Sequence, residues 1–219
     1  FAPTPEVMYP DGDPAVRVDP GPIATVLEGA TRPTHFAGVL QVVLTLMHLT
    51  RPRWALFGRK DAQQLAIVRA MVRDLAVPVE IVPVEIRREA DGLAMSSRNA
   101  YLTAQEREQA LALCHALDAG REAARAGASA AGVRTAALRV LTRAPGVEVD
   151  YVAVVAPDSF VDMTGAGPGL PCTGVGAGAG LPASRGPVGT ERTDRPAEPA
   201  LLALAAKVGT TRLIDNALI

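Results

Sequence analysis

The sequence is poor in lysine, cysteine and aromatic residues, and it has no long uninterrupted apolar run. Its two cysteines, Cys114 and Cys172, supply neither a disulfide framework nor the spacing of a metal site. The formal net charge of −1 excludes a strong positive field that would attract nucleic acid or an acidic membrane surface. The longest apolar stretch, 36–49, is too short and too interrupted by polar residues to span a bilayer. No basic-then-apolar leader opens the chain, so we expect a cytoplasmic protein without membrane or nucleic-acid partners.

Lysine is the scarcest charged residue of the chain. Lys60 and Lys207 are its two lysines, and the rest of its 22 basic residues are arginines. Lysine carries a compact point charge on a flexible stem, which some phosphate chemistry prefers to the rigid fork of arginine. Lys60 is therefore a candidate for contact with a phosphate group.

A strand, a helix and a second strand follow one another between residues 54 and 84. Trp54–Phe57 is a short apolar run typical of a buried strand in a parallel sheet, Asp61 is placed to cap a helix, and Val79–Val84 is the next strand. The apolar side chains of this helix that we expect to face inward are Leu65, Val68, Met71, Val72 and Leu75. This order predicts a right-handed βαβ unit and an α/β fold with a parallel sheet.

The segment Gly58–Asp61 lies at the carboxyl end of the first strand and at the N-terminus of the helix. Ligands of parallel sheets bind at the carboxyl ends of strands. Free N–H groups and the helix dipole favour an anion at the same place. The position favours contact between Lys60 and a phosphate; the alternative is a plain strand-to-helix turn with an incidental salt bridge.

Periodicity and turn residues predict the remaining elements. They are a short strand near Ala15–Val18, a helix from the cap Thr34 to Pro52, a helix over 104–126 opened by a capping box of Thr103 and Glu106, a helix from the cap Ser129 to about Arg143, a strand over Val147–Val155, and a β-hairpin of two apolar runs joined at Gly209. His35, in the first turn of its helix, is expected to be a packing or surface residue.

The composition changes between Met163 and Pro199. These 37 positions hold 9 glycines and 6 prolines and few large apolar side chains. Such a segment cannot bury enough apolar surface to offset its ordering entropy. It therefore predicts a flexible insertion, and its run GVGAGAG is not a phosphate-binding loop because no strand precedes it.

The segment Arg88–Leu102, READGLAMSSRNAYL, predicts a mobile loop that leads into a helix. It contains the turn pair Asp91-Gly92. Ser96, Ser97 and Arg98 then place two hydroxyls and a guanidinium side by side, a set that suits a bound polyphosphate. The alternative is a solvated loop of the same composition.

Four blocks of the sequence are similar, in order and spacing, to those of one enzyme family. They are LEGATRPTHFAGV, FGRKDAQQ, READGLAMSSRNAYL and GTTRLIDNAL. The chain resembles the pantothenate synthetases (pantoate–β-alanine ligases) from residue 1 to about 158 and again from residue 200. The resemblance implies the C-terminal part of a Rossmann-like nucleotide-binding domain over 1–86, a smaller C-terminal α+β lid domain over 87–219, and a homodimer.

The resemblance also implies an ATP-dependent ligase that uses Mg²⁺. Such enzymes join pantoate and ATP into pantoyl adenylate with release of pyrophosphate, and the amine of β-alanine then displaces AMP. The implied catalytic residues are Lys60, Ser96, Ser97 and Arg98, and Gln64 is the implied pantoate ligand. The implied ATP contacts are Gly58, Arg59, Lys60, Asp61, Arg87, Met95, Ser96, Ser97 and Arg98. None of these residues is expected to ligate a metal.

Three departures from the family pattern bear on activity. Arg59 stands where the family usually has glutamate, and Arg87 stands where an apolar residue is usual. The family's HxGH-type loop does not occur in the sequence, and Phe1 is not a normal start, so we expect the chain to lack the family's opening block. Two alternatives stay open: another nucleotidyltransferase of the same superfamily, and a non-catalytic fragment or pseudo-enzyme that pairs with an intact partner.

Overall fold

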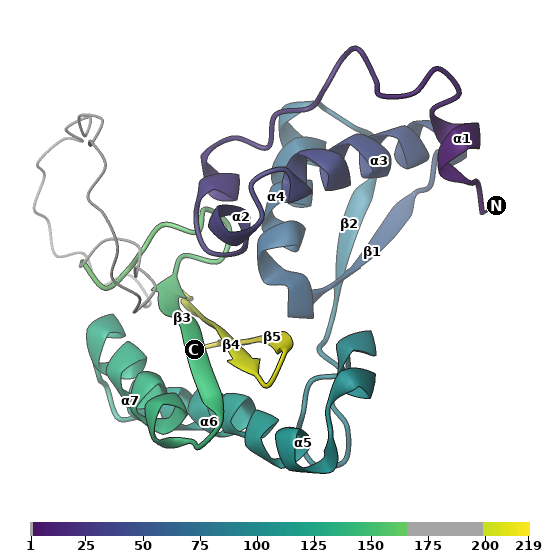
Figure 1. The fold of residues 1–219 in the computed structure, drawn as a ribbon. Helices are drawn as coiled ribbons and strands as arrows, with labels where there is room; N and C mark the ends of the chain where they lie inside the picture. Colours follow the sequence, from purple (N-terminus) through teal and green to yellow (C-terminus); the bar gives the residue numbers. More distant parts are fainter. Residues whose placement is uncertain (1, 166–198) are drawn as a thin grey trace, which may run out of the picture. The chain divides into compact units, whose positions relative to one another are not determined.

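The computed structural model describes residues 2–165 and 199–219. It contains one parallel sheet and one separate antiparallel sheet. This confirms the predicted α/β class. The chain divides into two compact units (Figure 1). Unit 1 comprises Phe1–Ile86 and Pro157–Phe160, and unit 2 comprises Arg87–Ala156 and Val161–Ile219. Cys172, the GVGAGAG run and most of the predicted insertion lie outside the described residues. Among the described helices, none has the length and apolar character needed to cross a bilayer.

Unit 1 is built around the predicted strand–helix–strand segment. Its elements are α1 (Pro5–Met8), η1 (Pro22–Thr25), α2 (Glu28–Thr31), α3 (His35–Thr50), β1 (Trp54–Gly58), η2 (Arg59–Asp61), α4 (Ala62–Asp74) and β2 (Glu80–Val84). β1 and β2 pair in parallel, with Trp54 opposite Glu80 and Gly58 opposite Val84. The predicted parallel βαβ unit is thus confirmed.

The core of unit 1 lies between α3, α4 and one face of the β1–β2 sheet. Its largest buried side chains are Phe36, Leu40, Met47, Ile67, Val68 and Met71. Leu75 was predicted to face inward, but it is exposed because α4 ends one residue earlier. The prediction of a buried first strand holds for only one face of β1. Side chains alternate along β1, and Leu56 on its open face is 67% exposed, whereas Ala55 and Phe57 pack on the core.

The strand predicted near Ala15–Val18 does not form. The backbone N–H of Val18 donates to the side-chain Oε1 of Gln41 on α3, 3.2 Å away. A side-chain acceptor thus takes the place that a neighbouring strand would have filled.

Two of the four predicted helix caps are made by side chains. Thr103 and Glu106 form the complete capping box, and Ser129 Oγ accepts from the backbone N–H of Gly132. Thr34 and Asp61 occupy N-cap positions, but neither side chain makes a cap hydrogen bond. At these two positions the predicted helix boundary is confirmed, and the predicted capping contact is wrong.

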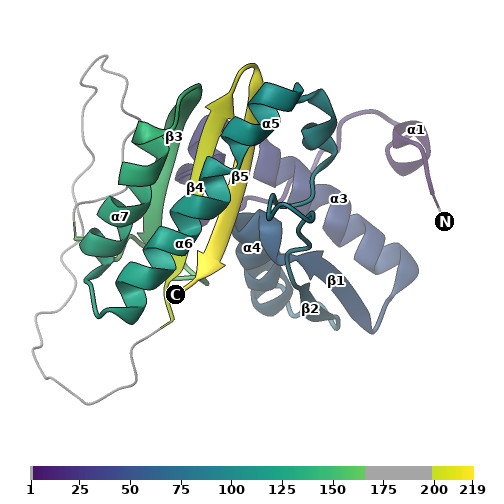
Figure 2. The same ribbon diagram turned by 90° about the horizontal axis from the view of Figure 1, so that it is seen from below.

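Unit 2 is a three-stranded antiparallel sheet in the order β3-β4-β5, covered on one face by α6 and α7 (Figure 2). Its elements are η3 (Ser97–Tyr101), α5 (Ala104–Ala110), α6 (Ala112–Arg125), α7 (Ala130–Arg143), β3 (Val147–Val155), β4 (Leu201–Val208) and β5 (Thr211–Leu218). The predicted hairpin is confirmed, and its turn places Gly209 at a φ of +58°. Cys114 is buried in this unit, as expected of a small core residue.

The single helix predicted over 104–126 is two helices. The chain breaks at Leu111, whose N–H donates to the carbonyl of Glu108 in a tightened turn. The strand over Val147–Val155 is confirmed, and its loose alternation has a physical cause. The register with β4 shifts between Val149 and Tyr151, and all residues from Tyr151 onward are buried.

Gly29 in α2 provides a test of the packing of unit 1. A Cβ at this position would collide with the backbone carbonyl of Ala24 in η1, which cannot move aside as a side chain can. We expect Gly29→Ala to lower the free energy of unfolding by about 1–3 kcal/mol. The fluorescence of Trp54, the single tryptophan, reports urea unfolding of this unit.

Gly38→Ala is the matched control for Gly29→Ala. Gly38 lies inside α3, and a Cβ there meets no atom within 4 Å. Alanine favours a helix, so this variant should be neutral or more stable by up to about 1 kcal/mol. Equal effects of the two variants would contradict the packing described for Gly29.

Gln63 provides a second test, because it fastens the segment before α3 to α4. Its buried amide donates to the carbonyls of Ile23 and Val26, at 2.6 and 2.8 Å, and accepts from the N–H of Glu28 at 3.1 Å. We expect Gln63→Ala to destabilise unit 1 by about 2 kcal/mol or more, since these backbone groups lose a buried partner. Gln64→Ala, at the half-buried neighbouring position, should change stability by less than about 0.5 kcal/mol. Equal losses in urea unfolding would refute the bracing role of Gln63.

Candidate functional site

The predicted site residues form two groups, one in each unit. The group in unit 1 lies where β1 ends and α4 begins. Its members are Gly58, Arg59, Lys60, Asp61 and Gln64. The group in unit 2 lies on the loop between β2 and α5, and its members are Arg87, Met95, Ser96, Ser97 and Arg98.

Lys60 sits in η2, the short turn that leads directly into the 13-residue helix α4. Its side chain is 19% exposed, and Nζ lies 3.9 Å from Oδ1 of Asp61. The stem is therefore largely packed while the ammonium group stays beside the helix N-terminus, where the helix dipole favours an anion. At 3.9 Å the contact with Asp61 is an ion pair and not a short hydrogen bond.

Arg59 has a carboxylate partner at the end of the neighbouring strand. Its Nε lies 2.8 Å from Oε1 of Glu85, the residue that follows β2. The carboxylate of Glu85 partly compensates the positive charge of Arg59. This pair lies at the carboxyl ends of β1 and β2, next to Lys60. Glu85 was missed by the sequence reasoning, although an acid one residue beyond the second strand is the signal that could have suggested it.

Gly58 is a glycine that neither packing nor backbone geometry requires. Its φ is −69°, which every residue adopts, and a Cβ built on it meets no atom within 4 Å. The carboxyl end of β1 is thus open to an approaching group. Gln64, one turn further on, is half-buried, whereas its neighbour Gln63 has the structural role described above.

The unit 2 group lies on a small hairpin followed by the turn η3. Arg88 and Ala94 form an antiparallel bridge, and Gly92 takes a φ of +93° at the tip, which confirms the predicted turn. The N–H of Met95 donates to the carbonyl of Arg87 at 2.9 Å, so two predicted ATP contacts are neighbours across the hairpin. The mobility of this loop stays a prediction.

The residues that follow the hairpin are open to solvent. Ser97 and Arg98 are exposed, and Ser96 is half-buried at the N-cap of η3, where its Oγ accepts from the N–H of Arg98 at 3.3 Å. Nη1 of Arg98 lies 3.5 Å from the carbonyl oxygen of Arg212 on β5. The two hydroxyls and the guanidinium thus belong to consecutive residues of a largely exposed segment, and their role at a polyphosphate stays a prediction.

The base of this loop is held by a network of charged side chains that sequence reasoning missed. Nδ2 of Asn99 donates to Glu89 at 2.6 Å and to the carbonyl of Ala94 at 3.1 Å, and Arg107 on α5 pairs with Glu89 and Asp91 at 2.7 Å. The hydrogen bond from Asn99, with that from Arg107, lowers the pKa of Glu89, and the two carboxylates raise the pKa of Arg107. Glu89 is therefore held in the charged form that the network needs.

Arg88, on the same hairpin, forms a separate long-range pair with Asp215. The pair joins residues 127 positions apart, which no local pattern reveals. The hydrogen bond to Asp215 raises the pKa of the Arg88 guanidinium, against the opposing effect of burial. An acid within the otherwise largely apolar strand LIDNAL is the signal that could have indicated a buried partner.

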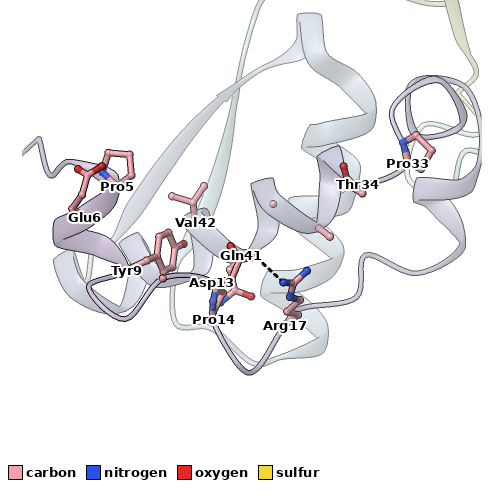
Figure 3. A pocket seen from close by; sticks show the side chains of 13 residues that line it. Pro5, Glu6, Tyr9, Asp13, Pro14, Arg17, Pro33, Thr34, Gln41 and Val42 are labelled. Carbon is pink, nitrogen blue, oxygen red and sulfur yellow. Dashed lines mark hydrogen bonds and ion pairs between the residues drawn. The ribbon is translucent and has the colours of Figure 1, made fainter.

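A separate hollow of about 670 Å³ lies in unit 1, between the first residues of the chain and α3 (Figure 3). Tyr9, Asp13 and Arg17 line one side and Gln41 and Val42 the other, and Arg17 pairs with Asp13 at 3.0 Å. None of the predicted site residues lines it. In the part of the chain that the structure describes, no three His, Cys, Asp or Glu side chains come together as a metal site.

The chain matches the family model of pantoate-beta-alanine ligase over residues 1–218. Pantothenate synthetases of Nocardia farcinica and Thermobifida fusca are each 48% identical to it over 99% of its length. The crystal structure of pantothenate synthetase from Thermus thermophilus superimposes with a TM-score of 0.77 at 41% identity, covering 99% of this chain and 68% of that one.

A more distant structure shares the fold. The pantoate-beta-alanine ligase of Francisella tularensis, solved in complex with Beta-gamma ATP and Beta-alanine, is 24% identical, with a TM-score of 0.56 over 97% of this chain and 61% of its own. The present chain spans 57% of the Nocardia relative and 66% of the Thermobifida relative. With a family model matched over nearly every residue and relatives close to half identical, the chain belongs to the pantoate-beta-alanine ligase family.

Proposed function

We propose that this chain carries ATP- and pantoate-binding machinery of a ligase that condenses pantoate with β-alanine through pantoyl adenylate. The observation that carries the proposal is the position of Lys60, packed along its stem at the carboxyl end of a parallel strand and at the start of α4. The names of the relatives and the ligands of the Francisella protein support this choice of substrates.

The first step needs fixed positive charge beside the departing phosphates. A carboxylate oxygen of pantoate bonds to the α-phosphorus of ATP, the bond from that phosphorus to the bridging oxygen breaks, and its electrons leave with pyrophosphate. A preorganised cation at the leaving group stabilises this transition state. Lys60 supplies that cation, and the open carboxyl end of β1 at Gly58 lets the nucleotide approach the backbone.

The second step transfers the acyl group to an amine. The amine of β-alanine attacks the carbonyl carbon of the adenylate, AMP departs with the electrons of the acyl–oxygen bond, and the nitrogen loses a proton. The main requirement for the protein is to hold two small substrates in sequence. Gln64 is assigned to pantoate, because an amide can both donate to and accept from a hydroxy acid.

Unit 2 is proposed to act as the lid domain that closes on the nucleotide. Ser96, Ser97 and Arg98 would donate to the phosphates, and the paired segment of Arg87 and Met95 would meet the adenine. Mg²⁺ would enter as the partner of the ATP phosphates, its usual mode of binding in such sites. We further propose a cytoplasmic homodimer.

A non-catalytic role in partnership with an intact protein is the second candidate. Parallel sheets are normally covered on both faces. In this chain Trp54 and Leu56 on β1 and Val84 on β2 are exposed, an apolar face suited to a further protein segment. Arg59 in place of the family's glutamate also favours this candidate.

Pantoate-dependent ATP–pyrophosphate exchange tests the ligase proposal. We expect Lys60→Ala to lower the exchange rate by about 10²-fold or more, because a charge partner of the leaving group is lost. Lys207→Ala is the matched control, since it removes the other lysine of the chain, an exposed residue on β4, and should leave the rate unchanged.

The outcomes of this assay separate the two candidates. An unchanged rate in Lys60→Ala would remove Lys60 from the mechanism. If the unaltered chain gives no exchange alone, the assay is repeated with the N-terminal segment of a relative added. Absence of exchange in both would favour the non-catalytic candidate.

A further inference from the structure

The block GTTRLIDNAL has no site role in the proposal above, although it is one of the four blocks shared with the family. In the structure it forms the turn at Gly209 and strand β5. Two of its residues contact the loop that carries Ser96, Ser97 and Arg98. Strand β5 therefore has a relation to the proposed site that the sequence separation conceals.

Asp215 makes the stronger of these contacts. Its two carboxylate oxygens accept from both terminal nitrogens of Arg88, at 2.6 and 3.0 Å, and Nη1 of Arg88 also donates to the carbonyl of Gly92 at 3.0 Å. The Asp215 side chain is 2% exposed and that of Arg88 is 26% exposed. A bidentate, largely buried pair of this kind fixes the orientation of both groups and not only their distance.

The second contact is made at the other end of the loop. The Arg212 carbonyl, three residues before Asp215 on β5, faces the guanidinium of Arg98 at 3.5 Å. The hairpin stem at Arg88 and the exposed end at Arg98 thus both rest on one strand. Met95, Ser96 and Ser97 lie between these two points and are not buried.

We propose that Asp215 is a positioning residue for the segment Met95–Arg98 and acts through Arg88. The proposal rests on the proposed nucleotide-binding function of that segment. Asp215 touches no substrate. It fixes the stem of the hairpin. The isolated bridge between Arg88 and Ala94 then sets where the next four residues lie. A loop held in advance loses less conformational entropy when it closes on a nucleotide.

The same sheet offers a matched ion pair that does not touch the stem. Nε and Nη2 of Arg212 bind Oδ2 of Asp150 at 2.7 and 2.6 Å, joining β5 to β3. The pair is also Arg–Asp and also partly buried. Asp150→Asn therefore weakens an ion pair of the same sheet while the Arg88–Asp215 contact stays intact.

Amide hydrogen exchange of the full chain tests the proposal without a substrate. In Asp215→Asn we expect the amides of 93–98 to exchange at least about tenfold faster, the effect of losing a charge-assisted hydrogen bond. Asp150→Asn should leave these amides at the unaltered rate. Protection along β3 and β4 should persist in both variants.

Arg88→Lys is a second variant that tests the proposal if Asp215→Asn does not fold. It keeps the positive charge opposite Asp215 but loses the two-pronged geometry. We expect faster exchange of the same amides, with a smaller increase than in Asp215→Asn. Exchange of 93–98 at the unaltered rate in a folded Arg88→Lys or Asp215→Asn variant would overturn the proposal.

The kinetics of pantoate-dependent ATP–pyrophosphate exchange distinguish a positioning role of Asp215 from a general loss of stability. Asp215→Asn should raise the KM for ATP by about tenfold or more, as expected for a displaced binding group. The KM for pantoate should stay unchanged, because Gln64 belongs to the other unit. Faster amide exchange with an unchanged KM for ATP would overturn the positioning role. An unaltered chain that gives no ATP–pyrophosphate exchange alone or with the N-terminal segment of a relative added would overturn the proposed function, while the hydrogen-exchange result would still decide whether Asp215 holds the loop.

Discussion

The buried ion pair between Arg88 and Asp215 is the constraint on which the loop of unit 2 depends. A carboxylate that is 2% exposed needs a charged partner, because an unpaired buried charge is strongly unfavourable. Both terminal nitrogens of Arg88 bind this carboxylate. Arg88 also forms the bridge with Ala94 at the base of the hairpin, so the ion pair holds the hairpin at its base. Glu89, Asn99 and Arg107 secure the rest of the base. The hydroxyls and guanidinium that follow are presented by a framework whose own charges are already paired.

Unit 1 presents its functional groups by a different route. The carboxyl end of β1 and the first turn of α4 are generic parts of a βαβ unit, and they place Lys60 at a helix N-terminus, where the helix dipole favours an anion. Gln63 braces the preceding segment from the same helix turn, which leaves Gln64 beside it at a half-buried position. Adjacent glutamines thus divide the structural and the proposed binding role.

Local patterns predicted most of the fold, because helices and paired strands follow the periodicity of their apolar residues. They failed where a distant group or a local break decided the outcome. The backbone N–H of Val18 binds the side chain of Gln41 and not a neighbouring strand, and Leu111 divides the predicted single helix into α5 and α6. The candidate site residues were predicted from motifs and resemblance. Their supports, Glu85 and Asp215, were missed because partners distant in sequence leave no periodic signal.

The central claim is that a nucleotide binds at the start of α4 and on the Met95–Arg98 segment. The most direct measurement is a titration of the ¹⁵N-labelled chain with ATP and Mg²⁺, followed by the amide resonances. We expect saturable shifts that concentrate on Gly58–Gln64 and on Met95–Arg98. Shifts that concentrate around Tyr9, Asp13 and Gln41, at the hollow of unit 1, or no saturable shifts at all, would contradict the claim.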